Sequence, residues 1–154
     1  MECSALTIWD DDYLRYDFGD HPLNPIRLDL TVRLARALGV FDNLDVIAPK
    51  PADDNQLLEI HTDEYLHAVR VASVDPSFTG FGLGTEDDPA FPGMFEAAAL
   101  IAGGSALAAH QLMAGAAQHV VNIAGGLHHA MPNAASGFCI FNDCVLAIRT
   151  LLDV

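Results

Sequence analysis

The sequence has few cysteines and few basic residues, and both shortages exclude classes of protein. Its three cysteines are odd in number and form no CxxC pair, which argues against a disulfide framework and against a zinc knuckle built on thiolates. Seven Lys and Arg stand against 21 Asp and Glu, and the net charge of −14 repels phosphate backbones and anionic lipid. We therefore expect neither nucleic acid nor a membrane surface as a partner.

The chain also lacks a recognisable secretory signal and a strong membrane span. Its first residues carry no basic side chain, and no adequate apolar run follows before Asp10. Residues 97–117 are nearly uncharged and reach transmembrane length, but they are mostly Ala and Gly, so their transfer energy into lipid is weak. We expect a buried helix there, and a protein of the reducing cytoplasm.

Hydrophobic spacing predicts an alternation of short strands and helices. The run at residues 120–124 is apolar and mostly β-branched, which is typical of a buried parallel strand. In a helix at residues 142–152, the spacing places Val145, Ile148 and Leu152 on the inward face. The other strands are expected at residues 6–9 and 44–47, and the other helices at residues 27–38 (with Leu30, Leu34 and Leu38 on one face), 53–60, 63–73 and 97–117.

No repeat, low-complexity tract or Ser/Gly linker divides the chain, so we expect residues 1–154 to form one α/β unit or part of one. Asp53 or Asp54 and Thr62 are suited to cap helices, because their side-chain oxygens can accept the free N–H groups of a first turn. Residues 75–93 are rich in Gly, Pro and Asp and lack periodicity. This pattern indicates a long loop of the kind that often borders a binding site.

Two adjacent histidines, His128 and His129, follow Gly125 and Gly126 directly after the strand at residues 120–124. Ligand chemistry in α/β sheets collects at that end of a strand, and the glycines let the backbone approach a ligand closely. A histidine near its neutral pKa can accept a proton from water and return it to a leaving amine. From the pair alone, two ordinary loop histidines are the more frequent interpretation.

Metal binding by the pair is disfavoured, because adjacent residues rarely aim at one ion. The remaining histidines fall in no ligand spacing, and we expect each to be a capping or surface residue: His21, His61, His67, His110 and His119. Cys139 and Cys144 have apolar neighbours and no nearby Lys or Arg to lower their pKa, which predicts buried, inert thiols. Asn142 and Asp143 are expected to cap the last helix and to support the preceding loop.

The longer string GGLHHAMPNAASGFCIFND at residues 125–143 closely resembles the histone deacetylase superfamily. Further motifs follow the family's order: HP at 21–22 with PIR at 25–27, HTDEYL at 61–66, and GLG at 82–84 before DDP at 87–89. The resemblance spans essentially the whole chain. AMP at 130–132 and FPGM at 91–94 are similar to the bacterial acetoin-utilization branch.

This resemblance implies a three-layer α/β/α arginase–deacetylase-like fold, present as its N-terminal portion. It implies a zinc-dependent hydrolase of N-acyl amides such as acetyl-lysine, in which His128 and His129 polarise the metal-bound water and move its proton. Gly137 and Phe138 would line the acyl-lysine channel, and Asp87, flanked by Glu86 and Asp88, would hold the substrate backbone at its rim. Arg27 would lie in the inner pocket from which acetate leaves, although a surface arginine at a helix start is an equally common arrangement.

The family's zinc ligands, an Asp-x-His pair and a later Asp, and its oxyanion-stabilising tyrosine cannot be mapped onto this sequence. We therefore assign no metal ligand in this chain, and we expect the chain alone to be inactive. Two alternatives remain open: a catalytically inactive acyl-lysine-binding or scaffold fragment, and an acetylpolyamine amidohydrolase. A sheet lacking its next strands would also expose an apolar edge, which predicts poor solubility or self-association.

Overall fold

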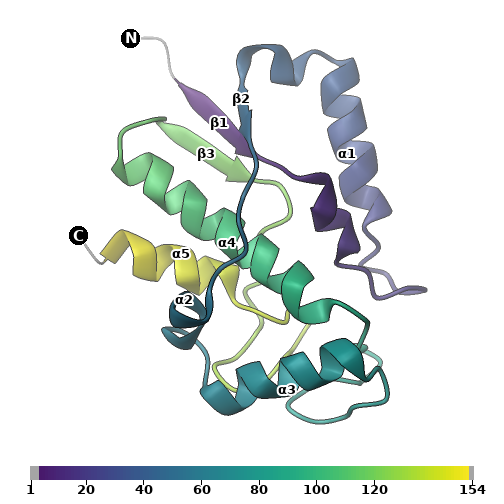
Figure 1. Cartoon of the computed structure of the whole chain (residues 1–154). Helices are drawn as coiled ribbons and strands as arrows, with labels where there is room; N and C mark the ends of the chain where they lie inside the picture. Colours follow the sequence, from purple (N-terminus) through teal and green to yellow (C-terminus); the bar gives the residue numbers. More distant parts are fainter. Residues whose placement is uncertain (1–3, 153–154) are drawn as a thin grey trace.

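The computed structural model describes residues 4–152, in which a small parallel sheet is combined with helices (Figure 1). The sheet consists of β1 (Ala5–Ile8), β2 (Asp45–Ile47) and β3 (His119–Asn122) in the order β2-β1-β3. Both neighbours run parallel to β1, with Leu6 opposite Asp45 on one side and Val120 on the other. The three predicted strands and the parallel direction of β3 are therefore confirmed.

The five predicted helices are also present, with ends that differ slightly from the expected ones. Two short 3-10 helices, η1 and η2, were not predicted. The helix expected at residues 97–117 both begins and ends earlier, and left-handed glycines lie close to its two ends, Gly93 with φ 77° and Gly115 with φ 66°. The elements are η1 (Asp11–Arg15), α1 (Ile26–Ala37), η2 (Val40–Asn43), α2 (Asp54–Leu58), α3 (Asp63–Val74), α4 (Met94–Met113) and α5 (Asp143–Leu152).

The predicted helix caps are confirmed by hydrogen bonds. The Asp53 carboxylate accepts the Gln56 N–H at 3.0 Å, and the Gln56 side chain accepts the Asp53 N–H at 3.0 Å, which forms a reciprocal capping box for α2. The Thr62 hydroxyl accepts the Tyr65 N–H at the start of α3. These caps define where α2 and α3 begin. The long loop that follows α3, at residues 75–93, is irregular as expected.

Helix α4 is the buried centre of the molecule, and it packs against β3, α3 and α5. Figure 1 shows α4 and α5 side by side, with α1 next to β2 and away from this pair. The close packing depends on small residues, because a Cβ at Gly103 would lie 1.9 Å from the carbonyl oxygen of Lys50. The predicted burial of this helix is confirmed. Within residues 4–152, no helix is both long and apolar enough to cross a membrane.

The inward face predicted for α5 is wrong. Val145, Ile148 and Leu152 are 41%, 54% and 69% exposed, whereas Leu146 is buried against the core. Periodic spacing shows which side chains share a face, but it does not show which face meets the core. Strand β3 is likewise more exposed than predicted, because it lies at an edge of the sheet, and Val121 is 55% exposed.

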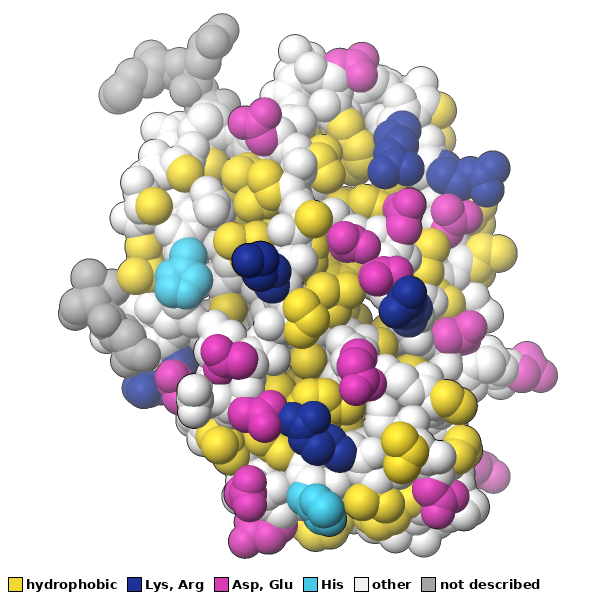
Figure 2. Space-filling model, viewed as in Figure 1, with side chains coloured by type: hydrophobic (Ala, Val, Ile, Leu, Met, Phe, Trp, Pro, Cys, Tyr) yellow, Lys and Arg dark blue, Asp and Glu magenta, His cyan; other side chains and the backbone are white. Residues whose placement is uncertain are grey.

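Helix α1 has the same character as α5. Leu30 and Leu34 lie on it, and Leu38 follows its last residue; each of the three is more than half exposed, and Val32 is the buried residue of the helix. Figure 2 shows apolar side chains reaching the surface over much of the visible face, with acidic side chains scattered among them. The acidic residues on this face therefore form no single patch.

Candidate active site

The two adjacent histidines lie on an exposed loop that leaves the end of β3. Gly126 has φ 105°, a conformation that favours glycine, and its carbonyl oxygen accepts the backbone N–H of His128 at 2.9 Å. The same oxygen is 2.9 Å from Nδ1 of His128. Since a carbonyl can only accept, Nδ1 carries the proton in this contact, and Nε2 is the basic nitrogen of the neutral ring.

The rings of His128 and His129 lie close together, with centroids 4.3 Å apart. Gly137 approaches the pair from the other end of the segment, because a Cβ built on it would lie 3.0 Å from Cβ and Cγ of His129. Gly137 also has φ 56°, so both its backbone conformation and its surroundings favour glycine. The histidine pair and Gly137 therefore form one compact group.

Phe138 stands beside this group in an unusual backbone conformation, with φ 69°. Tyr16, from the segment after η1, holds it in place: the Tyr16 hydroxyl donates to the Phe138 carbonyl oxygen at 2.8 Å and accepts the Ile140 N–H at 3.1 Å. The Phe138 ring is only partly buried and contacts the His21 ring edge-on, with centroids 4.7 Å apart. His21, expected to be a capping or surface residue, accepts the Leu23 N–H at 3.0 Å and is thus also a neighbour of the candidate site.

The long loop at residues 75–93 brings two carboxyl groups to the same place, in different surroundings. Asp87 is exposed, and its carboxylate accepts the Gly137 N–H at 3.0 Å. Asp88 is 2% exposed, and its Oδ1 has no hydrogen-bond partner among the described residues. Burial, with a smaller contribution from the charge of Asp87, raises the pKa of Asp88 to about 7. Of these two residues, Asp87 is therefore the one at the surface, and the buried Asp88 cannot take the position at the rim that the resemblance implies for Asp87.

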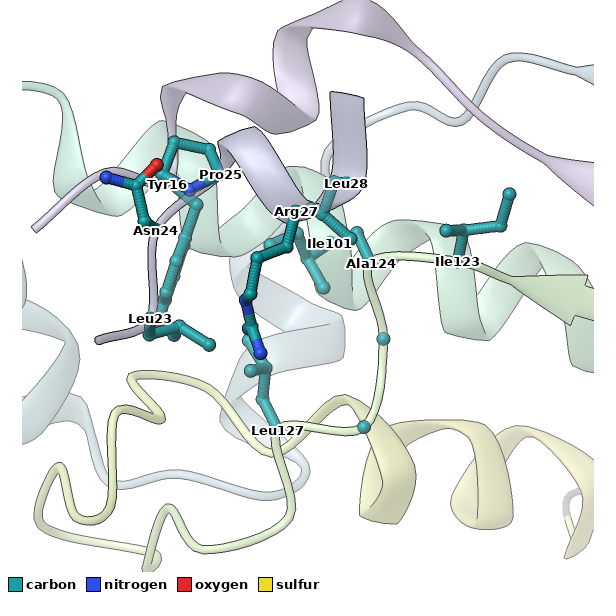
Figure 3. Close-up of a pocket in the computed structure, with 12 residues that line it drawn as sticks. Tyr16, Leu23, Asn24, Pro25, Arg27, Leu28, Ile101, Ile123, Ala124 and Leu127 are labelled. Carbon is teal, nitrogen blue, oxygen red and sulfur yellow. The ribbon is translucent and has the colours of Figure 1, made fainter. Parts of the chain in front are cut away.

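Arg27 lies at the start of α1 and lines a cavity of about 210 Å³. Figure 3 shows its side chain extending toward Leu127, with Tyr16 and Leu23 nearby. The cavity is otherwise mostly apolar, and its wall includes the backbone of Gly125 and Gly126, just before the histidine pair. The structure thus places Arg27 on the inner side of the loop that carries His128.

His61 was expected to be a surface or capping residue, and this prediction is wrong. It is 4% exposed, with Nδ1 3.1 Å from the Met131 carbonyl oxygen and Nε2 accepting the Asn142 N–H at 3.1 Å. Burial lowers the pKa of His61, which agrees with a neutral ring that donates at one nitrogen and accepts at the other. No spacing in the sequence indicates this bridge, because its partners are backbone groups distant in the chain.

The Cys139 thiol donates to the Gly137 carbonyl oxygen at 3.2 Å, beside the histidine pair. Cys139 is buried and Cys144 is half-buried rather than fully buried as expected; burial raises the pKa of both thiols, which favours the unreactive protonated form. Cys3 lies outside the described residues. Among residues 4–152, no group of three or more His, Cys, Asp or Glu side chains could hold a metal ion. The described residues therefore do not fit a complete zinc site.

A parallel α/β fold, a loop with two adjacent histidines and a neighbouring Gly-Phe pair agree with the arginase–deacetylase class of fold that the resemblance implies. Residues 21–154 match the histone deacetylase domain, so the chain belongs to the histone deacetylase family and has its arginase–deacetylase-like fold. This confirms the resemblance and the fold class predicted from the sequence.

Similar proteins occur in bacteria and in eukaryotes. The chain is 44% identical over 150 residues to the acetoin utilization protein AcuC of Bacillus subtilis, an alignment covering 94% of this chain and 39% of that protein. It is 36% identical to AcuC of Staphylococcus xylosus, covering 99% and 41%, and 38% identical to histone deacetylase clr6 of Schizosaccharomyces pombe, covering 94% and 37%. The chain thus spans about two fifths of the length of these relatives.

Proposed function

We propose that this chain contributes the proton-handling and substrate-lining part of a deacetylase that hydrolyses N-acyl amides such as acetyl-lysine. The observation that carries the proposal is the convergence of His128, His129 and Gly137, from the loop segment at residues 125–143, with Asp87 from the long loop at residues 75–93. Gly137 meets the His129 ring and donates its N–H to Asp87. Family membership supports a deacetylase-type function for this arrangement.

The histidine pair would move the proton of the attacking water to the leaving amine. His128 has Nε2 as its basic nitrogen, because Nδ1 donates to the Gly126 carbonyl oxygen. A neutral imidazole of this kind can accept a proton and later return it, a role typically worth about 10² to 10⁴ in rate. His129 lies next to it and would share the task.

Gly137 and Phe138 would line a channel for an aliphatic side chain. A glycine without a side chain beside a flat aromatic ring leaves a slot for the methylene stem of lysine or of a polyamine. Asp87 is exposed at the edge of this group, where its carboxylate can accept N–H groups of a substrate backbone. Arg27, in the cavity behind the loop, would attract the acetate product.

Zinc dependence is part of the proposal for the whole protein, with ligands that residues 4–152 do not supply. No described cluster fits the ion, so none of the steps assigned to these residues runs through it. We expect residues 1–154 to be the N-terminal portion of a single deacetylase-like domain and the protein to act in the cytoplasm. The chain alone, even with added zinc, is expected to show no turnover.

Two other functions are distinguished by their substrates or by the lack of turnover. An acetylpolyamine amidohydrolase would use the same slot, and an inactive fragment would bind acyl-lysine without hydrolysing it. The names of the AcuC relatives support a link to acetoin utilization over a role on polyamines.

The decisive experiment measures release of acetate from an acetyl-lysine peptide and from acetylated polyamines by the whole protein that contains this sequence. We expect turnover of the peptide, reduced about 10² to 10⁴-fold in His129→Ala. His67→Ala, at an exposed position on α3, is the matched control and should retain activity. Turnover by residues 1–154 alone would contradict the expected inactivity, and peptide binding without turnover by the whole protein would favour the scaffold function.

A further inference from the structure

Asp143 is the first residue of α5, yet its carboxylate does not cap that helix. The cap is Asn142, whose side-chain oxygen accepts the Val145 N–H at 3.0 Å. Asp143 is 1% exposed, and its carboxylate turns back toward the loop after β3. There it accepts the Leu127 N–H at 2.6 Å and the Gly126 N–H at 3.0 Å, in addition to the Ser105 hydroxyl at 2.5 Å.

A second set of contacts holds the carboxylate in place. Ser105, on α4, accepts a hydrogen bond from the Asn122 side chain at 2.9 Å, and Asn122 also donates to the Ile101 carbonyl oxygen at 3.1 Å. A Cβ at Gly125 would lie 2.6 Å from Oδ2 of Asp143, so glycine leaves the room that this network needs. The network joins the end of β3, the middle of α4 and the start of α5 to the loop.

The peptide group between Gly126 and Leu127 links this network to His128. Its N–H donates to Asp143, and its carbonyl oxygen accepts both the backbone N–H and Nδ1 of His128. A peptide group is planar and almost always trans, so fixing the direction of its N–H also fixes the direction of its carbonyl. A carboxylate on the N–H also polarises the carbonyl and strengthens the bond that it accepts.

We propose that Asp143 is a positioning residue that, through this one peptide group, holds His128 in the tautomer protonated at Nδ1. Nε2 is then the nitrogen that accepts a proton. The catalytic meaning of this tautomer rests on the proposed deacetylase function, but the tautomer itself is a property of this chain. Replacing Asp143 should release the Gly126 carbonyl and let His128 adopt the other tautomer.

The test is ¹⁵N NMR of the histidine rings in this chain, at a pH where they are neutral, together with hydrogen exchange of the Leu127 amide. In the wild type we expect His128 to be protonated at Nδ1. In Asp143→Asn we expect a shift toward the Nε2–H tautomer and faster exchange of the Leu127 amide, on the order of tenfold to a hundredfold, because a hydrogen bond to a charged group is lost.

Two controls separate positioning from a general loss of structure. Asp53→Asn removes the carboxylate that caps α2, which is distant in sequence from the loop. It should leave the His128 tautomer and the exchange rate of the Leu127 amide unchanged. His61, whose Nδ1 faces the Met131 carbonyl oxygen, is an internal reference whose tautomer should persist in folded Asp143→Asn. An unchanged His128 tautomer and unchanged Leu127 exchange in that folded variant would overturn the proposal.

If Asp143→Asn no longer melts cooperatively, the variant Ser105→Ala tests the proposal in its place. It removes one donor from the carboxylate and leaves both loop amides, so we expect Leu127 exchange to rise by a few-fold while the fold persists; unchanged exchange overturns the proposal. None of these measurements uses turnover. A failed tautomer test therefore leaves the deacetylase proposal standing, and an inactive whole protein leaves the tautomer result standing.

Discussion

The loop segment at residues 125–143 and the outer faces of α1 and α5 differ in how fully their groups are partnered. In the loop segment, the Asp143 carboxylate, the Asn142 N–H and the Phe138 carbonyl each have a hydrogen bond to another part of the chain, at Ser105, His61 and Tyr16 respectively. On the outer faces, Leu34 and Ile148 are more than half exposed. The geometry of the candidate site is therefore set by contacts within this chain, whereas the outer faces have no apolar partner among residues 4–152.

The largest expected effect is on stability, from removal of the buried bridge that holds the loop segment. His61→Ala leaves the Asn142 N–H without its partner, removes one of the two hydrogen bonds of the Met131 carbonyl oxygen, and opens a cavity next to α3. We expect a loss of about 3 kcal/mol in the free energy of unfolding, measured by urea denaturation. His67→Ala removes an exposed histidine of the same helix and should change stability by less than about 0.5 kcal/mol. Equal losses in the two variants would contradict the bridging role.

The next effect is a pH dependence that originates at Asp88. Its pKa is raised in the folded chain from 3.8 to about 7, so the folded state binds the proton more tightly than the unfolded state. Stability should therefore fall as the pH rises from about 4 to about 7, and the loss should be complete above pH 7. His61, whose pKa is lowered, acts in the opposite direction below pH 6.5.

The variant Asp88→Asn separates these two contributions. It keeps the shape of the side chain and removes the ionisation, so the wild type should lose about 2 kcal/mol relative to the variant between pH 4.5 and pH 8. Urea denaturation at several pH values measures this difference, from which the contribution of His61 cancels. Parallel stability curves for the two proteins would show that the Asp88 carboxyl is not desolvated as the structure indicates.

A smaller effect should distinguish two glycines with similar backbone conformations. Gly137 and Gly115 both have positive φ, so an alanine at either position is strained. A Cβ at Gly137 would also press against the His129 ring, whereas at Gly115 it would meet nothing within 4 Å. We expect Gly137→Ala to cost about 1 kcal/mol more than Gly115→Ala in urea denaturation, and to shift the NMR signals of His129. An equal cost for both variants would mean that Gly137 does not support the histidine pair.

The sequence predicted those features that depend on local pattern. The caps at Asp53 and Thr62, the parallel strand β3 and the helix after it all follow from neighbouring residues, and they are confirmed. The family resemblance also identified the histidine pair, whose role remains a proposal. Each of these signals lies within one short stretch of chain.

Features that depend on distant parts of the chain were not predictable in this way. The bridge made by His61 and the contact of His21 with Phe138 join segments far apart in sequence, and their residue types carry no distinctive spacing. The prediction of which face of α5 is buried was wrong for a related reason, because Val145 and Leu146 are both apolar. Only tertiary packing decides which of the two is buried.

The smallest expected effect on stability comes from substitutions on the outer faces of α1 and α5. These substitutions also test most directly how those faces differ from the loop segment. Leu34→Ser and Ile148→Ser should change the free energy of unfolding by about 0.5 kcal/mol or less, whereas Val32→Ala, on the buried side of α1, should cost about 2 kcal/mol. If these faces cause self-association, the double variant Leu34→Ser/Ile148→Ser should sediment more slowly than the wild type. A wild type that is monomeric by light scattering would contradict self-association through these faces. It would show that their exposed apolar side chains are too isolated to form an apolar patch large enough for association.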